Sequence, residues 1–318
     1  MGLPRVVPAR YPAAMCAPSR KWTSRTMHCL RDARAMPKAE PTLHSRVALV
    51  TGASRGIGRA IAVRLAAHGA AVVVASSPRS VAQAQQVCAA IADAGGRATF
   101  VSADLADPAA RARLAAESLA AFGHIDILVN NAAGISAYAP PSRIDSAARR
   151  AMFELDFHAP VDLAQALLPA MRERGWGRMV NIGSDTVRQP PIPYPGPAKQ
   201  VHALALYGCA KAALERYTQA LAAELHGSGV CASLVSPHKI ARSESAEAVA
   251  QQLQGIHPDW VEPVEMMAEA AYALIGAGLN GWCGSSRALL QLLQQPLRAL
   301  DGARVLGDAL TLDRDLAR

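Results

Sequence analysis

The sequence lacks any apolar run long enough to cross a membrane, although 51% of its 318 residues are hydrophobic. A spanning helix needs about 20 consecutive apolar residues, so we expect no membrane-embedded segment. The six cysteines form no C-x-x-C pair and show no metal-ligand spacing. They predict reduced thiols in a cytoplasmic protein, with neither a disulfide framework nor a metal site.

The main part of the chain also lacks a basic bias. The net charge of +8 comes mostly from residues 1–40, which hold eight Lys or Arg and only two acids, Asp32 and Glu40. The remaining 278 residues carry a net charge of only +2. Because nucleic-acid binding depends on a cluster of positive charge, the composition gives it little support.

Residues 1–44 show no hydrophobic period and no acid before Asp32. Their Pro, Arg and Ser content favours a disordered extension, or a start codon placed ahead of the true one at Met36. Organellar targeting peptides have a similar Arg- and Ser-rich, acid-poor composition, so import into an organelle stays open as the alternative. No apolar segment of a secretory signal follows the charges.

From Arg46 onward, apolar runs of strand length alternate with helical patterns. The runs are continuous, as expected of strands buried on both faces of a parallel sheet. The alternation predicts an α/β fold with one doubly wound parallel sheet, in a single domain at residues 45–280. The expected strands are Val47–Val50, Ala71–Ala75, Thr99–Ser102, Ile127–Val129, Met179–Ile182 and Cys231–Val235. The expected helices are Ile57–His68, Ser80–Ala94, a helix capped by Asp107 that ends at Gly123, and one from about Asp145 to Arg174.

A glycine-rich turn, Thr51–Gly58, follows the first apolar run. Three glycines at these positions permit a tight turn, close approach of the backbone to a phosphate, and packing of the next helix on the strand. The free N–H groups and the dipole at the start of that helix favour an anion. The turn, with Gly52, Gly56 and Gly58, therefore predicts a site for a nucleotide diphosphate.

Tyr207 and Lys211 are four residues apart and share one face of an apolar helical pattern. A lysine ammonium beside a phenol favours the phenolate and lowers its pKa, although the same spacing also fits an ordinary helix face. Ser184 follows the strand pattern that begins at Gly177, and Asn130–Gly134 ends another. The carboxyl ends of parallel strands meet on the ligand-binding side of such a sheet.

In combination and in order, these motifs resemble those of the short-chain dehydrogenase/reductase family, over about Arg46 to Leu274. The resemblance implies a Rossmann-type fold and hydride transfer between a nicotinamide cofactor and a small-molecule carbonyl or alcohol. Tyr207 would be the general acid or base, and Ser184 would orient the substrate oxygen. Lys211 would bind the nicotinamide ribose and lower the pKa of Tyr207. The resemblance also implies a homodimer or homotetramer.

The second strand is followed by no acid that could bind a ribose 2′-hydroxyl, as NAD enzymes require. Arg55 in the glycine turn, with Ser76 and Arg79 after the strand, instead suits a 2′-phosphate. We therefore predict NADP(H) in preference to NAD(H). The full set of predicted cofactor residues, some from the resemblance alone, is Gly52, Ser54, Arg55, Gly56, Ile57, Gly58, Ser76, Arg79, Asp104, Leu105, Asn131, Ala132, Tyr207, Lys211 and Pro237.

The chain departs from the family pattern at its helix asparagine, which is Asp156 here. Our hypothesis is that Asp156 substitutes for the asparagine in the proton relay, as a fourth catalytic residue, and competes for the charge of Lys211. The family's Pro-Gly reads Pro237-His238, and Arg242 stands where a cofactor-binding hydroxyl is usual, followed by Ser243.

Two segments also differ from the family in length or pattern. The stretch between Ser184 and Tyr207 is longer than usual and includes the proline-dense segment Gln189–Pro197. Residues 281–318 form a divergent extension, which lacks the expected closing strand and instead suggests a helix at Ala288–Leu293.

Two other functions stay open at this point. One is a non-catalytic nucleotide-binding regulatory protein on the same fold. The other is a partner-binding module built around the proline-rich loop. The apolar and proline-rich rim hints at a hydrophobic ketone, aldehyde or acyl chain as substrate, although a fold does not set the substrate.

Overall fold

The computed structural model describes residues 42–188, 203–255 and 257–308. Its centre is a seven-stranded sheet of order β3-β2-β1-β4-β5-β6-β9, in which every neighbouring pair is parallel. The strands are β1 (Val47–Thr51), β2 (Ala71–Ser76), β3 (Arg97–Ser102), β4 (Ile127–Asn130), β5 (Gly177–Ile182), β6 (Val230–Ser236) and β9 (Cys283–Ser285). The predicted α/β fold is confirmed, and each of the six predicted strands lies within an observed one.

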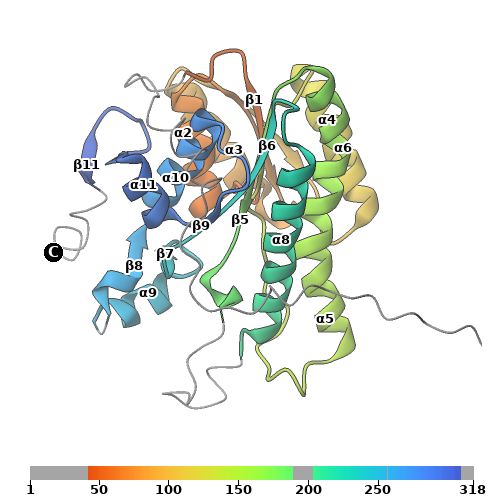
Figure 1. Ribbon diagram of the computed structural model, residues 1–318, viewed down its shortest axis with the longest axis vertical. Helices are drawn as coiled ribbons and strands as arrows, with labels where there is room; N and C mark the ends of the chain where they lie inside the picture. Colours follow the sequence, from red (N-terminus) through yellow and green to blue (C-terminus); the bar gives the residue numbers. More distant parts are fainter. Residues whose placement is uncertain (1–41, 189–202, 256, 309–318) are drawn as a thin grey trace, which may run out of the picture. The chain divides into compact units, whose positions relative to one another are not determined.

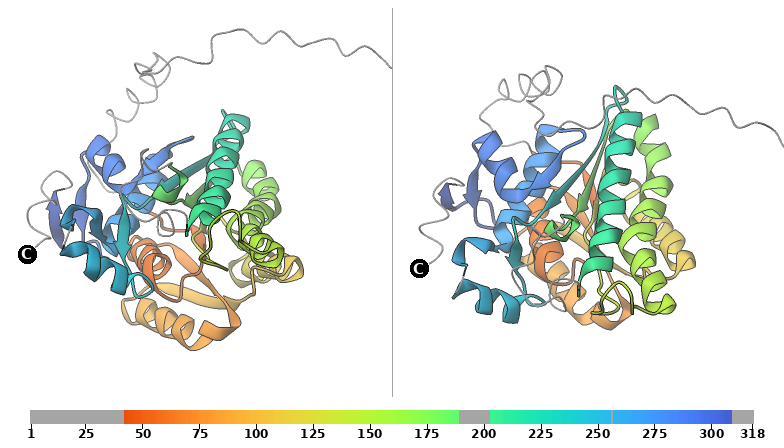
Figure 2. Two further views of the ribbon diagram at one scale, coloured as in Figure 1. Left: turned by 90° about the horizontal axis from the view of Figure 1, so that it is seen from below. Right: turned by 60° about the horizontal axis from the view of Figure 1, so that its bottom comes forward.

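Helices cover both faces of the sheet (Figure 1). One face carries α2 (Gly56–Ala67), α3 (Val81–Asp93), α10 (Val264–Ala277) and α11 (Ser286–Leu293). The other carries α4 (Pro108–Phe122), α6 (Ala159–Glu173) and α8 (Ala205–Glu224), with α5 (Ser146–Phe153) leading into α6. Figure 2 shows the same division from two further sides, with α6 and α8 adjacent in green and teal.

Both layers of helices have their own apolar core. Along β1, Ala48 and Val50 face the core beneath α2 and α10, while Val47 and Leu49 face the core beneath α4 and α6. These four side chains are at most 2% exposed. Burial on both faces explains why the strand reads as a continuous apolar run.

The helix boundaries follow local chemistry. The Asp107 side chain accepts a hydrogen bond from the Ala109 N–H at the start of α4, and Gly123 ends that helix in the left-handed conformation. The long helix predicted from Asp145 begins there, with the Asp145 side chain accepting a hydrogen bond from the Ala148 N–H, but it is divided between α5 and α6 by a π-helical turn, Glu154–His158. This turn places Asp156 in the interior, where its exposed fraction is 0%.

The expectation that the closing strand is missing is wrong. Strand β9 pairs in parallel with β6, from Leu234 opposite Cys283 to Ser236 opposite Ser285. Its three residues, Cys-Gly-Ser, contain no apolar run that a sequence pattern could reveal. The helix expected at Ala288–Leu293 is present as α11, which the Ser285 side chain caps by accepting from the Ala288 N–H.

Shorter elements flank the main sheet. They are β7 (Ile240–Arg242), α9 (Glu247–Gln254), β8 (Val261–Pro263), β10 (Pro296–Arg298) and β11 (Val305–Asp308). Strands β7 and β8 pair in parallel, and β10 and β11 pair in antiparallel fashion. The proline-dense segment Gln189–Pro197 and nearly all of the predicted extension at residues 1–44 lie outside the described residues.

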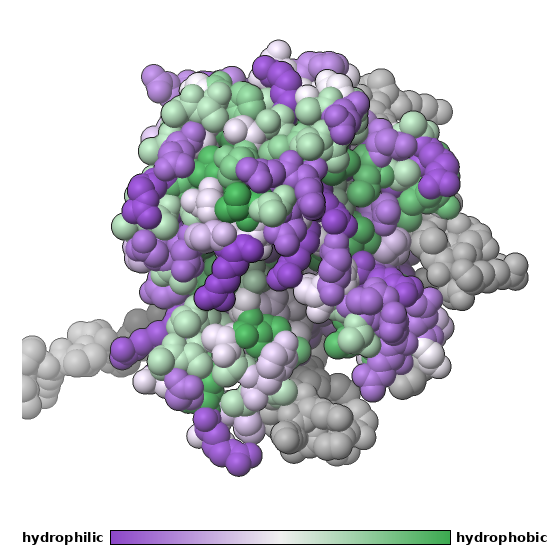
Figure 3. Space-filling view, turned by 180° about the vertical axis from the view of Figure 1, so that it is seen from behind, coloured by the Kyte–Doolittle hydropathy of each residue, from purple (hydrophilic) through white to green (hydrophobic). Residues whose placement is uncertain are grey.

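The described surface is mixed in character. Among large apolar side chains in the described residues, the exposed ones are Tyr138, Val249, Leu292 and Val305. Figure 3 shows one face of the molecule, on which hydrophobic areas are interrupted by hydrophilic side chains. No helix in the described part of the chain is both long enough and apolar enough to span a bilayer.

Candidate active site

A cavity of about 440 Å³ opens at the carboxyl ends of the parallel strands. It lies where β1 and β4 are neighbours and the strand order reverses direction, the usual position of a ligand site in such sheets. Most of the residues predicted to bind the cofactor or to act in catalysis line this one cavity. They are Gly52, Ser54, Arg55, Gly56, Ile57, Ser76, Asp104, Leu105, Asn131, Ala132, Ser184, Tyr207, Lys211 and Pro237.

Three predicted residues do not line the cavity. Gly58 lies behind the glycine turn, where an added Cβ would come 2.4 Å from the Gly52 carbonyl oxygen. Arg79 is exposed in a short turn beside the cavity. Asp156 is buried behind Lys211. Gly58 therefore serves packing, in keeping with one of the three needs assigned to the glycines.

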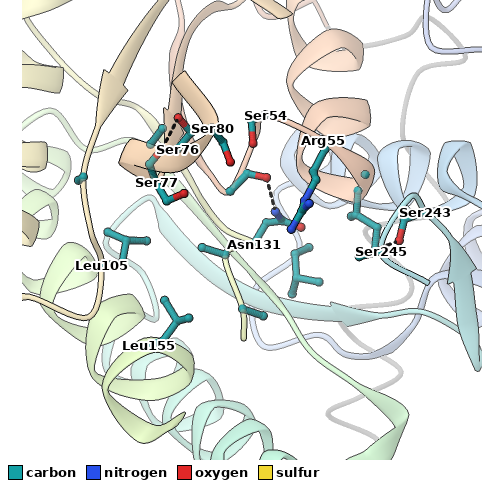
Figure 4. A pocket seen from close by; sticks show the side chains of 18 of the residues that line it. Ser54, Arg55, Ser76, Ser77, Ser80, Leu105, Asn131, Leu155, Ser243 and Ser245 are labelled. Atoms are coloured by element: carbon teal, nitrogen blue, oxygen red, sulfur yellow. Dashed lines mark hydrogen bonds between the residues drawn. The ribbon is translucent and has the colours of Figure 1, made fainter. Parts of the chain in front are cut away.

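Several lining residues escaped the sequence analysis (Figure 4). Ser77 and Ser80 follow β2, and Ser243 and Ser245 follow β7. The first pair could have been found, because serines directly after the second strand stand beside the predicted Ser76. The second pair directly follows Arg242, the position of the expected hydroxyl, but the sequence does not show that this segment lies beside the glycine turn.

The glycine turn is held in shape by the end of β4. The Thr51 side-chain oxygen accepts hydrogen bonds from the N–H groups of Asn131 and Ala132, at 3.0 and 3.1 Å. The Asn131 side chain donates in return to the carbonyl oxygens of Thr51 and Gly52, at 2.9 and 3.2 Å. These bonds satisfy polar groups of the turn and connect it to the end of β4.

Close packing brings Ser184 to the start of α8. An added Cβ at Gly208 would come 2.4 Å from the Thr186 carbonyl oxygen, so only glycine lets the segment after β5 lie against the first turn of α8. The Ser184 hydroxyl is 2.8 Å from the Thr186 hydroxyl and also accepts from the Thr186 N–H at 3.3 Å. The Ser184 side chain also favours the ionised form of Tyr207, which lines the same cavity.

Lys211 and Asp156 form a buried ion pair behind Tyr207. The Lys211 Nζ lies 3.5 Å from Asp156 Oδ1, and it also donates to the Ile182 carbonyl oxygen at 3.1 Å. Asp156 Oδ1 accepts from the Gly134 N–H at 3.3 Å, whereas its Oδ2 has no hydrogen-bond partner among the described residues. The two side chains are 1% and 0% exposed.

Burial governs the acidity of these three groups. It raises the pKa of Asp156 to about 6, although Lys211 and the Gly134 N–H favour the ionised form. Burial also lowers the pKa of Lys211, against the opposing charge of Asp156. The pKa of Tyr207 is raised well above its usual value, first by burial and then by the charge of Asp156, with the hydrogen bond to Ser184 acting in the opposite direction.

The prediction that Lys211 lowers the pKa of Tyr207 is therefore wrong for the chain by itself. The Lys211 Nζ is 5.7 Å from the centre of the Tyr207 ring but only 3.5 Å from Asp156. The carboxylate takes up the lysine charge and adds its own repulsion to a phenolate. Burial is the larger cause of the raised pKa, and the negative charge of Asp156 adds to it.

Comparison with known proteins now identifies the family. Residues 46–254, more than half of the chain, match the family model of the short chain dehydrogenases. The chain belongs to the short-chain dehydrogenase/reductase family. The predicted family is thereby confirmed, and the enzyme class with it, because the relatives below are reductases and dehydrogenases.

Two solved structures resemble this short-chain dehydrogenase closely. A short chain dehydrogenase from Burkholderia cenocepacia J2315 in complex with NADP is 31% identical, covers 76% of this chain and 96% of its own, and superposes with a TM-score of 0.66. A metagenomic short-chain oxidoreductase in complex with NADP is 36% identical, with coverages of 62% and 84% and a TM-score of 0.55.

Among curated proteins, the chain is 35% identical to the ketoacyl reductase HetN of Nostoc sp. (strain PCC 7120) over 202 residues. The match covers 64% of this chain and 66% of HetN. The chain thus spans slightly less than two thirds of the length of that relative.

Proposed function

We propose that this chain is an NADP(H)-dependent oxidoreductase that transfers a hydride between the cofactor and a small carbonyl or alcohol. The observation that carries the proposal is the convergence of Ser184, Tyr207 and Lys211 with the glycine turn on a single cavity. The predicted dinucleotide-binding turn and the predicted proton donor therefore line the same cavity. NADP in the Burkholderia and metagenomic relatives supports the choice of cofactor.

The cradle fits a dinucleotide. Gly52 and Gly56 have φ of +63° and +56°, which favours glycine, and an added Cβ at Gly52 would come 2.9 Å from the Ala132 backbone. The turn therefore presents bare backbone to the cavity, which lets a diphosphate approach closely. When bound, the nicotinamide ring supplies or accepts the hydride, and the protein positions it.

Tyr207 is suited to act as the general acid. Because its pKa is raised, the phenol keeps its proton at neutral pH and can give it to the carbonyl oxygen of a substrate. The Ser184 hydroxyl, which lines the same cavity as Tyr207, would orient and polarise the same oxygen. In alcohol oxidation the roles reverse, and the proton passes from the alcohol to Tyr207.

In the proposed proton relay, Asp156 stands where the family has an asparagine and acts on Tyr207 through Lys211. The free lone pairs of Asp156 Oδ2 can accept a hydrogen bond from a water, as the family's asparagine does by resemblance. Unlike asparagine, a carboxylate with a pKa of about 6 can also bind a proton within the physiological range. We infer that Asp156 and Lys211 together set the pH at which Tyr207 exchanges its proton.

The cavity wall favours a 2′-phosphate over a 2′-hydroxyl. After β2 the lining residues are Ser76, Ser77 and Ser80, which carry hydroxyl groups and no carboxylate. Arg55 lines the same cavity from the glycine turn (Figure 4). Hydroxyl and guanidinium groups are good partners for a phosphate. We therefore infer a preference for NADP(H).

The first prediction concerns Tyr207→Phe. Loss of the phenol proton should lower kcat for carbonyl reduction by about 100- to 10,000-fold, because general acid catalysis contributes that much, while the Kd for NADPH stays within about twofold of wild type. A panel of ketones and aldehydes, followed at the NADPH absorbance band, measures the rate. A wild-type protein that binds NADPH but reduces no member of the panel would favour the non-catalytic alternative.

The second prediction concerns Arg55→Ala. Removal of the guanidinium should lower the NADPH-to-NADH ratio of kcat/KM by about 10- to 100-fold, the usual worth of a charge-assisted hydrogen bond. The matched control is Arg149→Ala, an exposed arginine on α5 that is not among the residues lining the cavity. A wild-type preference for NADH would contradict the assignment.

The third prediction concerns Asp156→Asn, which keeps the shape of the side chain and removes its charge. The pKa of Tyr207 should fall, because the carboxylate no longer repels the phenolate and Lys211 no longer has a counter-charge. The rise of kcat/KM with pH in alcohol oxidation should move down by about one pH unit. Below pH 6 the two profiles should converge, because Asp156 is then protonated in the wild type.

The control for this third prediction is Asp162→Asn, which removes a half-exposed carboxylate from α6 that pairs with Arg111. Its profile should match the wild type. An Asp156→Asn profile that also matches the wild type would show that Asp156 is a bystander in proton transfer.

A further inference from the structure

The loop after β7 is tied to the glycine turn by Glu244. One oxygen of its carboxylate accepts a hydrogen bond from the Gly56 N–H at 2.8 Å, and the other pairs with the Arg59 guanidinium at 2.6 Å. Glu244 and Gly56 are 188 residues apart in the sequence. The contact joins the first turn of α2 to the loop Ser243–Ser245, called here the 243–245 loop.

The amino end of helix α2 has no capping side chain or acidic residue of its own. Arg55 occupies its N-cap position without a side-chain cap hydrogen bond, and no acid lies in the first turn. The amino end of a helix leaves N–H groups without intrahelical partners and carries a positive dipole, so an acid there is stabilising. Glu244 supplies the missing cap from a distant part of the chain.

The carboxylate lies outside the cofactor cavity, while its neighbours line it. Ser243 and Ser245 are among the residues lining that cavity, and Glu244 is not. Glu244 instead lines an adjoining hollow together with Arg55 and Arg59. The space of about 440 Å³ is therefore present with the Glu244 contact made. The contact closes the 243–245 loop against the turn without filling the cofactor space.

The two serines offer hydroxyl groups to that space. Their side-chain oxygens are 3.2 Å apart, and Figure 4 shows both beside Arg55 at the edge of the cavity. Arg242, which stands in the sequence position of the expected hydroxyl, is held elsewhere by Glu247 at 2.8 Å and by Gln254 at 2.9 Å. The missing hydroxyl is therefore replaced by those of the next residues.

We propose that Ser243 and Ser245 bind the diphosphate of NADP(H), and that Glu244 is the positioning residue that fastens their loop to the amino end of α2. This proposal rests on the proposed function, because it requires a dinucleotide in the cavity. Arg59 also contributes to this arrangement. By pairing with Glu244, it neutralises a negative charge that would otherwise repel the cofactor phosphates.

Fluorescence titration with NADPH, and its displacement in a stopped-flow instrument, test the proposal. Glu244→Gln should release NADPH about 3- to 10-fold faster, the worth of a half-exposed charged contact. Ser243→Ala and Ser245→Ala should each weaken NADPH binding about 2- to 5-fold. The matched control is Glu247→Gln, three residues after Glu244. It breaks the ion pair between Glu247 and Arg242 and should leave NADPH binding unchanged.

A fragment separates positioning from a general loss of structure. Adenosine 2′-monophosphate carries the 2′-phosphate but neither phosphate of the diphosphate bridge, so its affinity should be the same in wild type and Glu244→Gln. Arg59→Gln should weaken NADPH binding, and the double variant Glu244→Gln/Arg59→Gln should lose less than the two single losses combined, because both act through one contact.

Three results would overturn the proposal. The first is an unchanged rate of NADPH release from Glu244→Gln. The second is tighter NADPH binding by that variant, which would mean that Glu244 competes with a phosphate. The third is an equal loss of affinity for NADPH and for the fragment. Failure of the proposed function is distinct, since a wild-type chain that binds neither NADPH nor NADP+ would overturn both proposals together.

Discussion

The buried ion pair of Lys211 and Asp156 is the interaction on which the arrangement of the site depends. Taking two charges out of water costs more free energy than any exposed pair returns, so each charge needs the other nearby. The pair joins α8 to the π-helical turn before α6, and the hydrogen bond from Lys211 to the Ile182 carbonyl adds β5. Three elements are thereby fixed in one register around Tyr207.

The pair also decides what the site can do. Because burial and the charge of Asp156 outweigh the opposing effect of Ser184, the pKa of Tyr207 is raised and the phenol keeps its proton. A site of this kind is suited to delivering a proton to a carbonyl oxygen. The glycine turn across the cavity is held by other contacts, the hydrogen bonds between Thr51 and Asn131. The contacts that hold the proton donor and those that hold the cofactor turn thus meet in the segment after β4, where Asn131 bonds Thr51 and Gly134 bonds Asp156.

Much of the fold was predictable because buried parallel strands leave continuous apolar runs, as at Val47–Val50, and helix ends leave caps, as at Asp107. Strand β9 was not, because three residues between a loop and a helix carry no pattern. Most candidate site residues followed from motifs at strand ends. The direction of the pKa shift at Tyr207 did not, since burial is a property of the folded chain. Glu244 left no signal either, because its partner Gly56 is 188 residues away.

The most direct test of this account is the titration of Asp156 by carbon-13 NMR of labelled aspartate carboxyl groups, with Asp156→Asn to assign the resonance. The account predicts a titration near pH 6, well above that of an exposed aspartate, and a further rise in Lys211→Met, which removes the cation that favours the carboxylate. A titration below pH 4, unchanged by Lys211→Met, would contradict it. In that case burial would not raise the pKa of Asp156, and Lys211 would not lower it.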